Sequence, residues 1–243
     1  MEINFSDPKY YTNRELSWVL FDHRVLNEAR DKNIPLFERL KFLSITASNL
    51  DEFFMIRVAS LKDMENAGYT KKDIAGMTPT EQLKALHVAI HELVDLQYST
   101  YNRSLLPLLE KNGLHIIREH EQLTAEEALY VDQYFQENVY PVLTPMAVDS
   151  SRPFPLIRNK SLNIGAMVRK KNSDEELEFA TVQVPSVLSR VVRIPSKGKT
   201  CKIILLEEII ERNMDKLFLN YDIVCAHPFR IMRNADLSID EDE

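Results

Sequence analysis

Apolar residues in the first half of the chain recur at the three- and four-residue spacing of amphipathic helices. A first helix is expected to begin at Thr12-x-x-Glu15, a capping box in which both side chains satisfy free backbone N–H groups. Its apolar stripe includes His23, which we expect to be a core or interface histidine. Pro35 suits the first position of a second helix, which is predicted to reach about Ile45. The pattern therefore predicts two consecutive helices at the start of the chain.

A small, polar stretch, Thr46-Ala47-Ser48-Asn49, follows the second helix. Ser48 and Asn49 are favoured N-cap residues, and Asp51 and Glu52 are acidic residues of the kind favoured in a first helical turn. We therefore predict a break at this stretch and a third helix over residues 50–67.

Thr78-Pro79-Thr80-Glu81 is the strongest helix start in the chain, because it combines a cap, a proline at the first position and a glutamate at the third. The helix that follows is predicted to reach Leu109, with a bend or an early end at Pro107. Asn112-Gly113 is a typical stop signal. These signals predict an all-α helical bundle as a first domain over residues 1–112.

After Gly113 the period of the apolar residues changes, and short β-branched runs alternate with helical ones. The clearest feature is a hairpin in which residues 162–168 and 178–184 form the two strands. The other predicted strands cover 114–118, 191–194, 202–204, 222–225 and 229–232, and the predicted helices cover 124–139 and 206–218. The expected fold is α+β overall, with a mixed α+β second domain over residues 113–243.

Composition narrows the class of protein. The 243 residues are 44% hydrophobic and 28% charged, an ordinary balance for a globular chain. The net charge of −7 argues against a general nucleic-acid binder, although a local basic lining for a polyanion is compatible with it. Cys201 and Cys225 stand far apart, so neither a disulfide framework nor a structural zinc site is expected.

The chain carries no signal-peptide pattern and no run close to the roughly 20 apolar residues of a membrane span. The expected location is therefore the cytoplasm. The final segment, Asn234–Glu243, ends in acidic residues and has two interpretations, an acidic tail or a chain that ends at a domain junction.

Catalytic motifs are missing from the sequence. The five glycines are scattered and form no phosphate-binding loop, and no Gly-x-Ser-x-Gly motif occurs. His87 and His91 are four residues apart on a predicted helix, a spacing that can hold a metal ion if a third ligand is supplied. The ordinary alternative is a pair of solvated or partly packed histidines. We assign no catalytic residue and no metal ligand.

Asn49 is the one candidate for ligand binding. At a helix start it would lie beside free N–H groups and a positive dipole end, which suit a polar or anionic ligand. Its amide can donate and accept together, as recognition of an adenine edge requires. A plain cap is the alternative. Arginine side chains suit phosphate oxygens, although a surface arginine is more often simply solvated. The arginines that could contact phosphate include Arg14, Arg24, Arg39, Arg57 and Arg152.

Two groups of motifs resemble bacterial polyphosphate kinases of the phosphohistidine type. The first consists of Glu15-Leu16-Ser17-Trp18 and Asn49-Leu50-Asp51-Glu52-Phe53. The second consists of Pro141–Asp149, Pro153-Phe154-Pro155, Asn159–Asn163 and the stretch Phe229–Asp236. The resemblance covers nearly the whole chain. It departs from the family pattern at Arg158 and Lys160, which are more basic than usual, and in the Gly68–Gly76 loop.

The resemblance implies an enzyme that reversibly transfers the terminal phosphate of ATP to inorganic polyphosphate through a phosphohistidine, with magnesium. It implies a helical N-terminal domain, a head (middle) domain and two catalytic domains, in a homo-oligomer that in some members associates peripherally with the inner membrane face. ATP or ADP and polyphosphate are then the expected partners, and nucleic acid is not. Asn49 matches the N-domain asparagine that contacts the nucleotide base, so ATP binding is expected there.

None of the six histidines falls in a segment like the phosphohistidine region, and magnesium ligands are not expected here. The resemblance therefore implies the front part of such an enzyme, ending at the junction to missing catalytic domains and inactive by itself. A second hypothesis, from a different class, is a non-catalytic module for dimerisation or membrane-surface contact. Phe154, Leu156 and Ile157, which lie near prolines, would then form its exposed contact.

Overall fold

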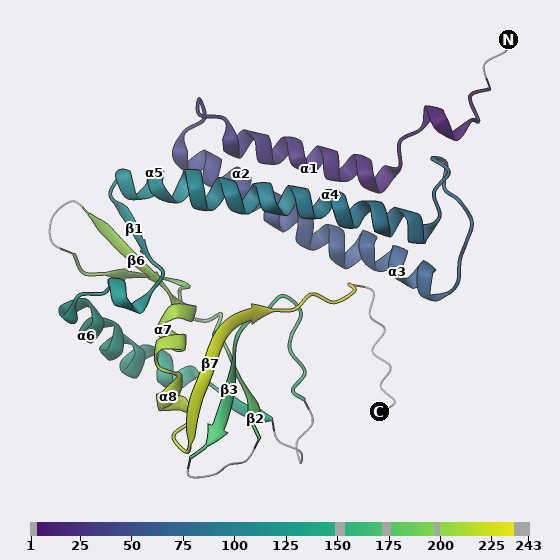
Figure 1. Cartoon of the computed structure of the whole chain (residues 1–243). Coiled ribbons are helices and arrows are strands. Elements are labelled where there is room, and N and C mark those ends of the chain that lie inside the picture. Colours follow the sequence, from purple (N-terminus) through teal and green to yellow (C-terminus); the bar gives the residue numbers. More distant parts are fainter. Residues whose placement is uncertain (1–3, 149–153, 172–175, 197–199, 236–243) are drawn as a thin grey trace. The chain divides into compact units, whose positions relative to one another are not determined.

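The computed structural model describes residues 4–148, 154–171, 176–196 and 200–235. The chain divides into two compact units (Figure 1): one is Met1–Leu109 together with the segment that begins at Met232, and the other is Glu110–Ile231. The sequence placed a boundary at residue 112 and assigned the segment after Ile231 to the second domain. In the structure this segment contacts the helices of the first unit, where Ala235 N donates to Met55 O at 3.0 Å.

Helix α1, Arg14–Arg30, begins one residue later than the predicted cap at Thr12 would place it. Asn13 is the N-cap, and its Oδ1 accepts a hydrogen bond from Leu16 N at 2.9 Å. The Asn13 amide also donates to Asp73 Oδ2 at 2.7 Å, which ties the helix start to a distant loop. The predicted capping box at Thr12 is therefore wrong, because the neighbouring asparagine caps the helix and gains a second, long-range partner.

Helix α2, Leu36–Phe53, runs without interruption through the stretch where a break was predicted. Its buried residues follow helical spacing across that stretch, at Leu43, Thr46, Leu50 and Phe53. Thr46 Oγ1 donates to Phe42 O at 3.0 Å, so this hydroxyl bonds to the helix instead of ending it. The prediction of Asn49 as an N-cap is therefore wrong. Packing of the apolar face decides here over the weak local preference of small polar residues.

The irregularity of this region lies further along the chain. A π-helical turn, Phe54–Val58, joins α2 to α3, Ala59–Asn66. Helix α4, Pro79–Thr100, starts at Thr78 with the predicted capping box, which is confirmed.

Helix α4 continues through a second π-helical turn, Tyr101–Leu105, into α5, Leu106–Lys111. The helical segment therefore does not end early at Pro107 but continues to Lys111, and the irregularity lies before the proline, in the π-helical turn. Gly113, with φ of 83°, follows the end of α5 as predicted.

The first unit is all-α, as predicted, because each helix buries an apolar stripe in a shared core. Helix α1 packs against α2 and α4, and α3 packs against α4. The largest fully buried side chains of this core are Leu26, Phe53, Leu86, Leu93 and Leu105. Arg39 is buried among them, and its Nε donates to Ala29 O at 2.9 Å.

The second unit is mixed α+β, as predicted, and its described residues form two sheets. The three-stranded sheet has the order β1 (Leu114–Ile117), β6 (Cys201–Leu205), β5 (Val191–Ile194), with β1 parallel and β5 antiparallel to β6. The antiparallel four-stranded sheet has the order β2 (Pro145–Val148), β4 (Glu178–Gln183), β3 (Leu162–Lys170), β7 (Tyr221–Arg230). The predicted β3–β4 hairpin is confirmed.

Strand β7 corrects a prediction of two short strands, because it pairs with β3 along its whole length, apart from a register shift at Met167 and Val168. Strand β2 was not predicted, since Pro145 is untypical of a strand interior.

Helix α6, Ala125–Tyr134, has the capping box expected at Thr124. The single helix predicted over 206–218 is two helices, α7 (Leu206–Arg212) and α8 (Met214–Leu217). Asn213 separates them by donating its amide to Ile209 O at 2.8 Å.

Among the residues that the structure describes, no helix combines the length and the apolar character needed to cross a bilayer. The acidic segment Asp236–Glu243 lies outside the described residues, and so does Arg152.

Candidate functional site

Helices α1, α2 and α3 and the π-helical turn between α2 and α3 line an open pocket of about 370 Å³ in the first unit. Beside the carboxylates of Glu15 and Glu52, three kinds of side chain meet in it: an aromatic pair, a carboxamide and two guanidinium groups. The residues that carry these groups are Trp18, Phe53, Asn49, Arg14 and Arg57. The fold thus brings the two halves of the first motif group, which are separated by more than 30 residues in the sequence, into one site.

The aromatic pair forms a flat apolar wall of this pocket. The Trp18 and Phe53 rings are stacked, with centroids 4.2 Å apart and planes inclined by 14°. Phe53 is only 1% exposed and belongs to the core, so it holds the half-buried Trp18 ring in place. A fixed indole face offers a stacking surface for a planar ligand such as a nucleobase.

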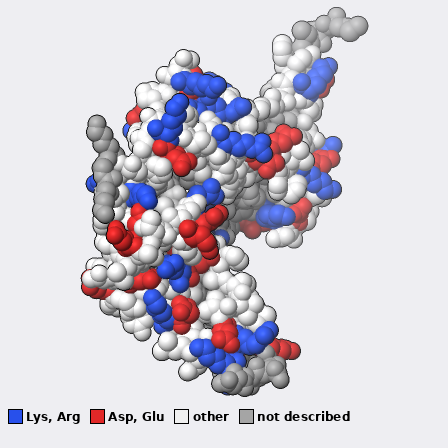
Figure 2. Space-filling model, turned by 60° about the vertical axis from the view of Figure 1, so that its left-hand side comes forward, with Lys and Arg blue, Asp and Glu red and all other residues white. Residues whose placement is uncertain are grey.

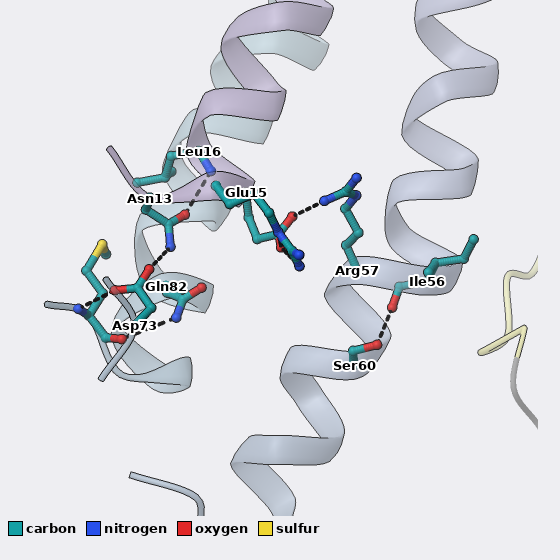
Figure 3. Close-up of polar contacts among 10 residues, drawn as sticks. Asn13, Glu15, Leu16, Ile56, Arg57, Ser60, Asp73 and Gln82 are labelled. Carbon is teal, nitrogen blue, oxygen red and sulfur yellow. Dashed lines mark hydrogen bonds and ion pairs between the residues drawn. The ribbon is translucent and has the colours of Figure 1, made fainter. Parts of the chain in front are cut away.

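A buried carboxylate organises the guanidinium groups. The Glu15 side chain is 5% exposed and accepts from Arg57 Nη1 at 3.1 Å (Figure 3). Arg14 Nε donates to the other oxygen of the same carboxylate at 2.8 Å. Each guanidinium has five N–H donors, so both arginines keep donors for a further anion after binding Glu15.

Arg57 lies in the π-helical turn, a rare geometry that is often found at functional sites. The wider turn changes the pairing of its carbonyl groups, and two outside donors bind there. Ser60 Oγ donates to Ile56 O at 2.7 Å, and Ala235 N donates to Met55 O. Figure 3 shows the first of these bonds beside Arg57. The turn is therefore held in shape by specific contacts.

Asn49 is half-buried in the pocket wall, and a residue behind it controls its amide. Asn49 Nδ2 donates to Asp22 Oδ1 at 2.8 Å. Asp22 is 0% exposed, and its Oδ2 has no hydrogen-bond partner among the described residues. Burial raises the pKa of Asp22 to about 6, an effect that the hydrogen bond from Asn49 opposes.

Sequence reasoning did not predict that Glu15 would bind the two arginines or that Asp22 would bind Asn49. Glu15 was interpreted as part of a cap, and Asp22 was not considered. A signal was nevertheless present, because both follow the helical spacing of the buried stripe of α1: Glu15, Val19, Asp22, Leu26 and Ala29. An acidic residue on an apolar stripe is uncommon and points to a specific role.

The other candidate residues lie elsewhere. The His87 and His91 rings on α4 have centroids 4.2 Å apart, and His91 Nδ1 donates to His87 O at 2.7 Å. They border a separate, mostly apolar pocket of about 410 Å³. Within the described part of the chain, no three His, Cys, Asp or Glu residues are grouped so that they could hold a metal ion.

Figure 2 shows basic and acidic side chains intermixed on one face of the molecule. On the described residues of this face, neither sign covers a large continuous area. The pocket shows the same mixture, because Arg14 and Arg57 line it together with Glu15 and Glu52.

The chain matches two family models in succession. The polyphosphate kinase N-terminal domain matches residues 11–117, and the polyphosphate kinase middle domain matches residues 126–243. Among curated relatives, the polyphosphate kinase of Lactiplantibacillus plantarum is 49% identical over 99% of this chain, and that of Bacillus anthracis is 47% identical over 99%. The matches cover 33% and 35% of those proteins, so the chain spans about a third of their length.

A solved structure agrees with these matches. The crystal structure of polyphosphate kinase from Porphyromonas gingivalis superposes with a TM-score of 0.82 at 29% identity, over 94% of this chain and 34% of that one. Both units of the chain are thus accounted for by one family, in sequence and in fold. The chain belongs to the polyphosphate kinase family, of which it carries the N-terminal and middle domains.

Proposed function

We propose that this chain works as part of a longer polyphosphate kinase, which reversibly transfers the terminal phosphate of ATP to inorganic polyphosphate. Its role in that enzyme is to form one wall of the nucleotide site, at the pocket between α1 and α2. The observation that carries the proposal is the meeting of Asn49, the stacked Trp18 and two arginines in one pocket. Two further curated relatives, from Bacillus cereus and Halalkalibacterium halodurans, are also named polyphosphate kinase.

Each part of the pocket supplies an interaction that a nucleoside triphosphate needs. The Trp18 face stacks on the purine ring, the Asn49 amide bonds to the edge of the base, and Arg57 with Arg14 attracts phosphate oxygens. None of these groups is a nucleophile, so the phosphate-transferring residue belongs to the rest of the enzyme. The magnesium that the reaction requires is, in this proposal, held by the remaining domains as well.

Replacing Asn49 with alanine in the full-length enzyme that contains this chain is the test. We expect the KM for ATP to rise about tenfold, the equivalent of one lost hydrogen bond of roughly 1.4 kcal/mol, with kcat changed little. Ser48→Ala is the matched control, since Ser48 is the exposed neighbour of Asn49 on α2. Equal KM values in the Asn49→Ala variant and the wild type would remove Asn49 from the nucleotide site.

A second proposed role is self-association through the second unit. Leu156 is 86% exposed and Phe154 is 61% exposed, whereas Ile157, which was expected in the same contact, is buried. We propose that the two exposed apolar side chains, which are two residues apart in the sequence, belong to a contact between two copies of the chain. We expect sedimentation of the 243-residue chain to show a dimer that Leu156→Ser weakens at least tenfold. A wild-type chain that stays monomeric at high concentration would contradict this role.

A further inference from the structure

We infer that Asp22 is a positioning residue that fixes the Asn49 amide with its carboxamide oxygen toward the base, and that this orientation makes the pocket select purines with an amino group at position 6. The inference rests on the proposed function and adds to it the chemical basis of base selection. Asp22 does not line the pocket and acts only through Asn49.

The orientation follows from the chemistry of the two side chains. An ionised carboxylate accepts hydrogen bonds and cannot donate them. Asp22 therefore requires the NH2 group of Asn49 on its side, as the 2.8 Å bond from Nδ2 to Oδ1 shows. A rotation of the amide by half a turn would bring two acceptors together inside the protein, which is costly.

The rest of the Asn49 amide is then available to a ligand. Among the described residues, no group donates to Asn49 Oδ1, and the half-buried side chain lines the pocket. Oδ1 can accept from a 6-amino group, while the second N–H of Nδ2 can donate to a ring nitrogen. This paired bonding is the pattern by which asparagine recognises the edge of adenine. A 6-oxo purine would place its carbonyl oxygen against Oδ1 and be rejected.

The packing of α1 against its neighbouring helices does not by itself explain why a carboxylate is buried at position 22. Asp22 is 0% exposed, on the face of α1 that packs against α2 and α4, and its Oδ2 has no partner among the described residues. An apolar side chain of similar size would pack there without the cost of burying a charge. The carboxylate accepts its hydrogen bond from the Asn49 amide, so orienting that amide is the role that accounts for a buried charge at this position.

The experiment measures base selection in the full-length enzyme that contains this chain. Values of kcat/KM are compared for ATP, inosine triphosphate, which has a carbonyl at position 6, and purine riboside triphosphate, which has hydrogen there. We expect the wild type to prefer ATP over inosine triphosphate by about tenfold or more. Asp22→Asn, whose amide can donate or accept toward Asn49, is expected to bring this ratio close to one, with kcat for ATP within about twofold.

The outcomes separate the inference from the proposed function. A lost preference in both Asp22→Asn and Asn49→Ala supports the inference. If Asn49→Ala loses the preference and Asp22→Asn keeps it, Asn49 still reads the base and Asp22 does not position it. If neither variant changes the preference or the KM for ATP, the assignment of the base to this pocket fails together with the inference. A wild-type enzyme that does not prefer ATP over inosine triphosphate would also overturn the inference.

Discussion

Replacing Phe53 with alanine is expected to destabilise the helical unit by about 3 to 5 kcal/mol and to disorder the pocket proposed to bind the nucleotide at the same time. Phe53 is 1% exposed, so its removal leaves a cavity in the core between α1, α2 and α4. The same ring supports Trp18 at a centroid distance of 4.2 Å, so the indole loses its fixed position. Stability and the shape of the site therefore depend on one side chain.

Urea denaturation followed by tryptophan emission measures this effect. Trp18 is the only tryptophan among the 243 residues, so the signal reports on the helical unit alone. Phe37→Ala is the matched control, because Phe37 lies on the same helix but is 59% exposed, and its loss is expected to cost less than about 0.5 kcal/mol. Comparable losses in the two variants would show that Phe53 is not a core residue.

Replacing Asp22 with asparagine is expected to stabilise the folded chain by about 1 to 3 kcal/mol at pH 7.5. Burial raises the pKa of Asp22 from 3.8 to about 6, so the folded chain holds this proton more tightly than the unfolded chain does. The contribution of Asp22 to wild-type stability therefore falls as the pH rises from about 4 through about 6. The amide of the variant does not titrate, so the gain should be absent below pH 4 and complete above pH 7.

Thermal unfolding of wild type and variant at a series of pH values tests this expectation. Glu28→Gln, at an exposed position of the same helix, is the control and should change stability by less than about 0.5 kcal/mol at every pH. A loss of stability in Asp22→Asn at pH 7.5 would mean that the ionised carboxylate stabilises the fold. We therefore expect Asp22→Asn to be more stable than the wild type and to select the base less well. This trade-off between stability and function is common at functional residues.

The sequence predicted elements best where strong local signals and long-range packing agree. The capping boxes at Thr78 and Thr124 start helices as expected, and the β3–β4 hairpin follows from two β-branched runs. At Thr12 and Asn49 the local signals predicted helix starts that do not occur, and tertiary contacts decided. Asn13 gains Asp73 as a partner, 60 residues away along the chain, which no local pattern could indicate.

The candidate site was only partly predictable for the same reason. Asn49 and Trp18 were singled out by their resemblance to family motifs, and the structure places them in one pocket. The role of Asn49 in ATP binding stays a prediction. The reason first given for it, a free helix start, is wrong, because Asn49 lies inside α2. Arg57 and Asp22 gain their meaning only from contacts across helices, to Glu15 and Asn49.

Photolabelling of the full-length enzyme with 8-azido-ATP, followed by mapping of the labelled peptides, tests the central claim most directly because the reactive group is on the base itself. The account predicts label on peptides from α1 around Trp18 or from α2 and the π-helical turn between Asn49 and Arg57, with unlabelled ATP in excess removing it. Label that ATP removes in the same way, but that maps only to segments outside the helical unit, would contradict the account.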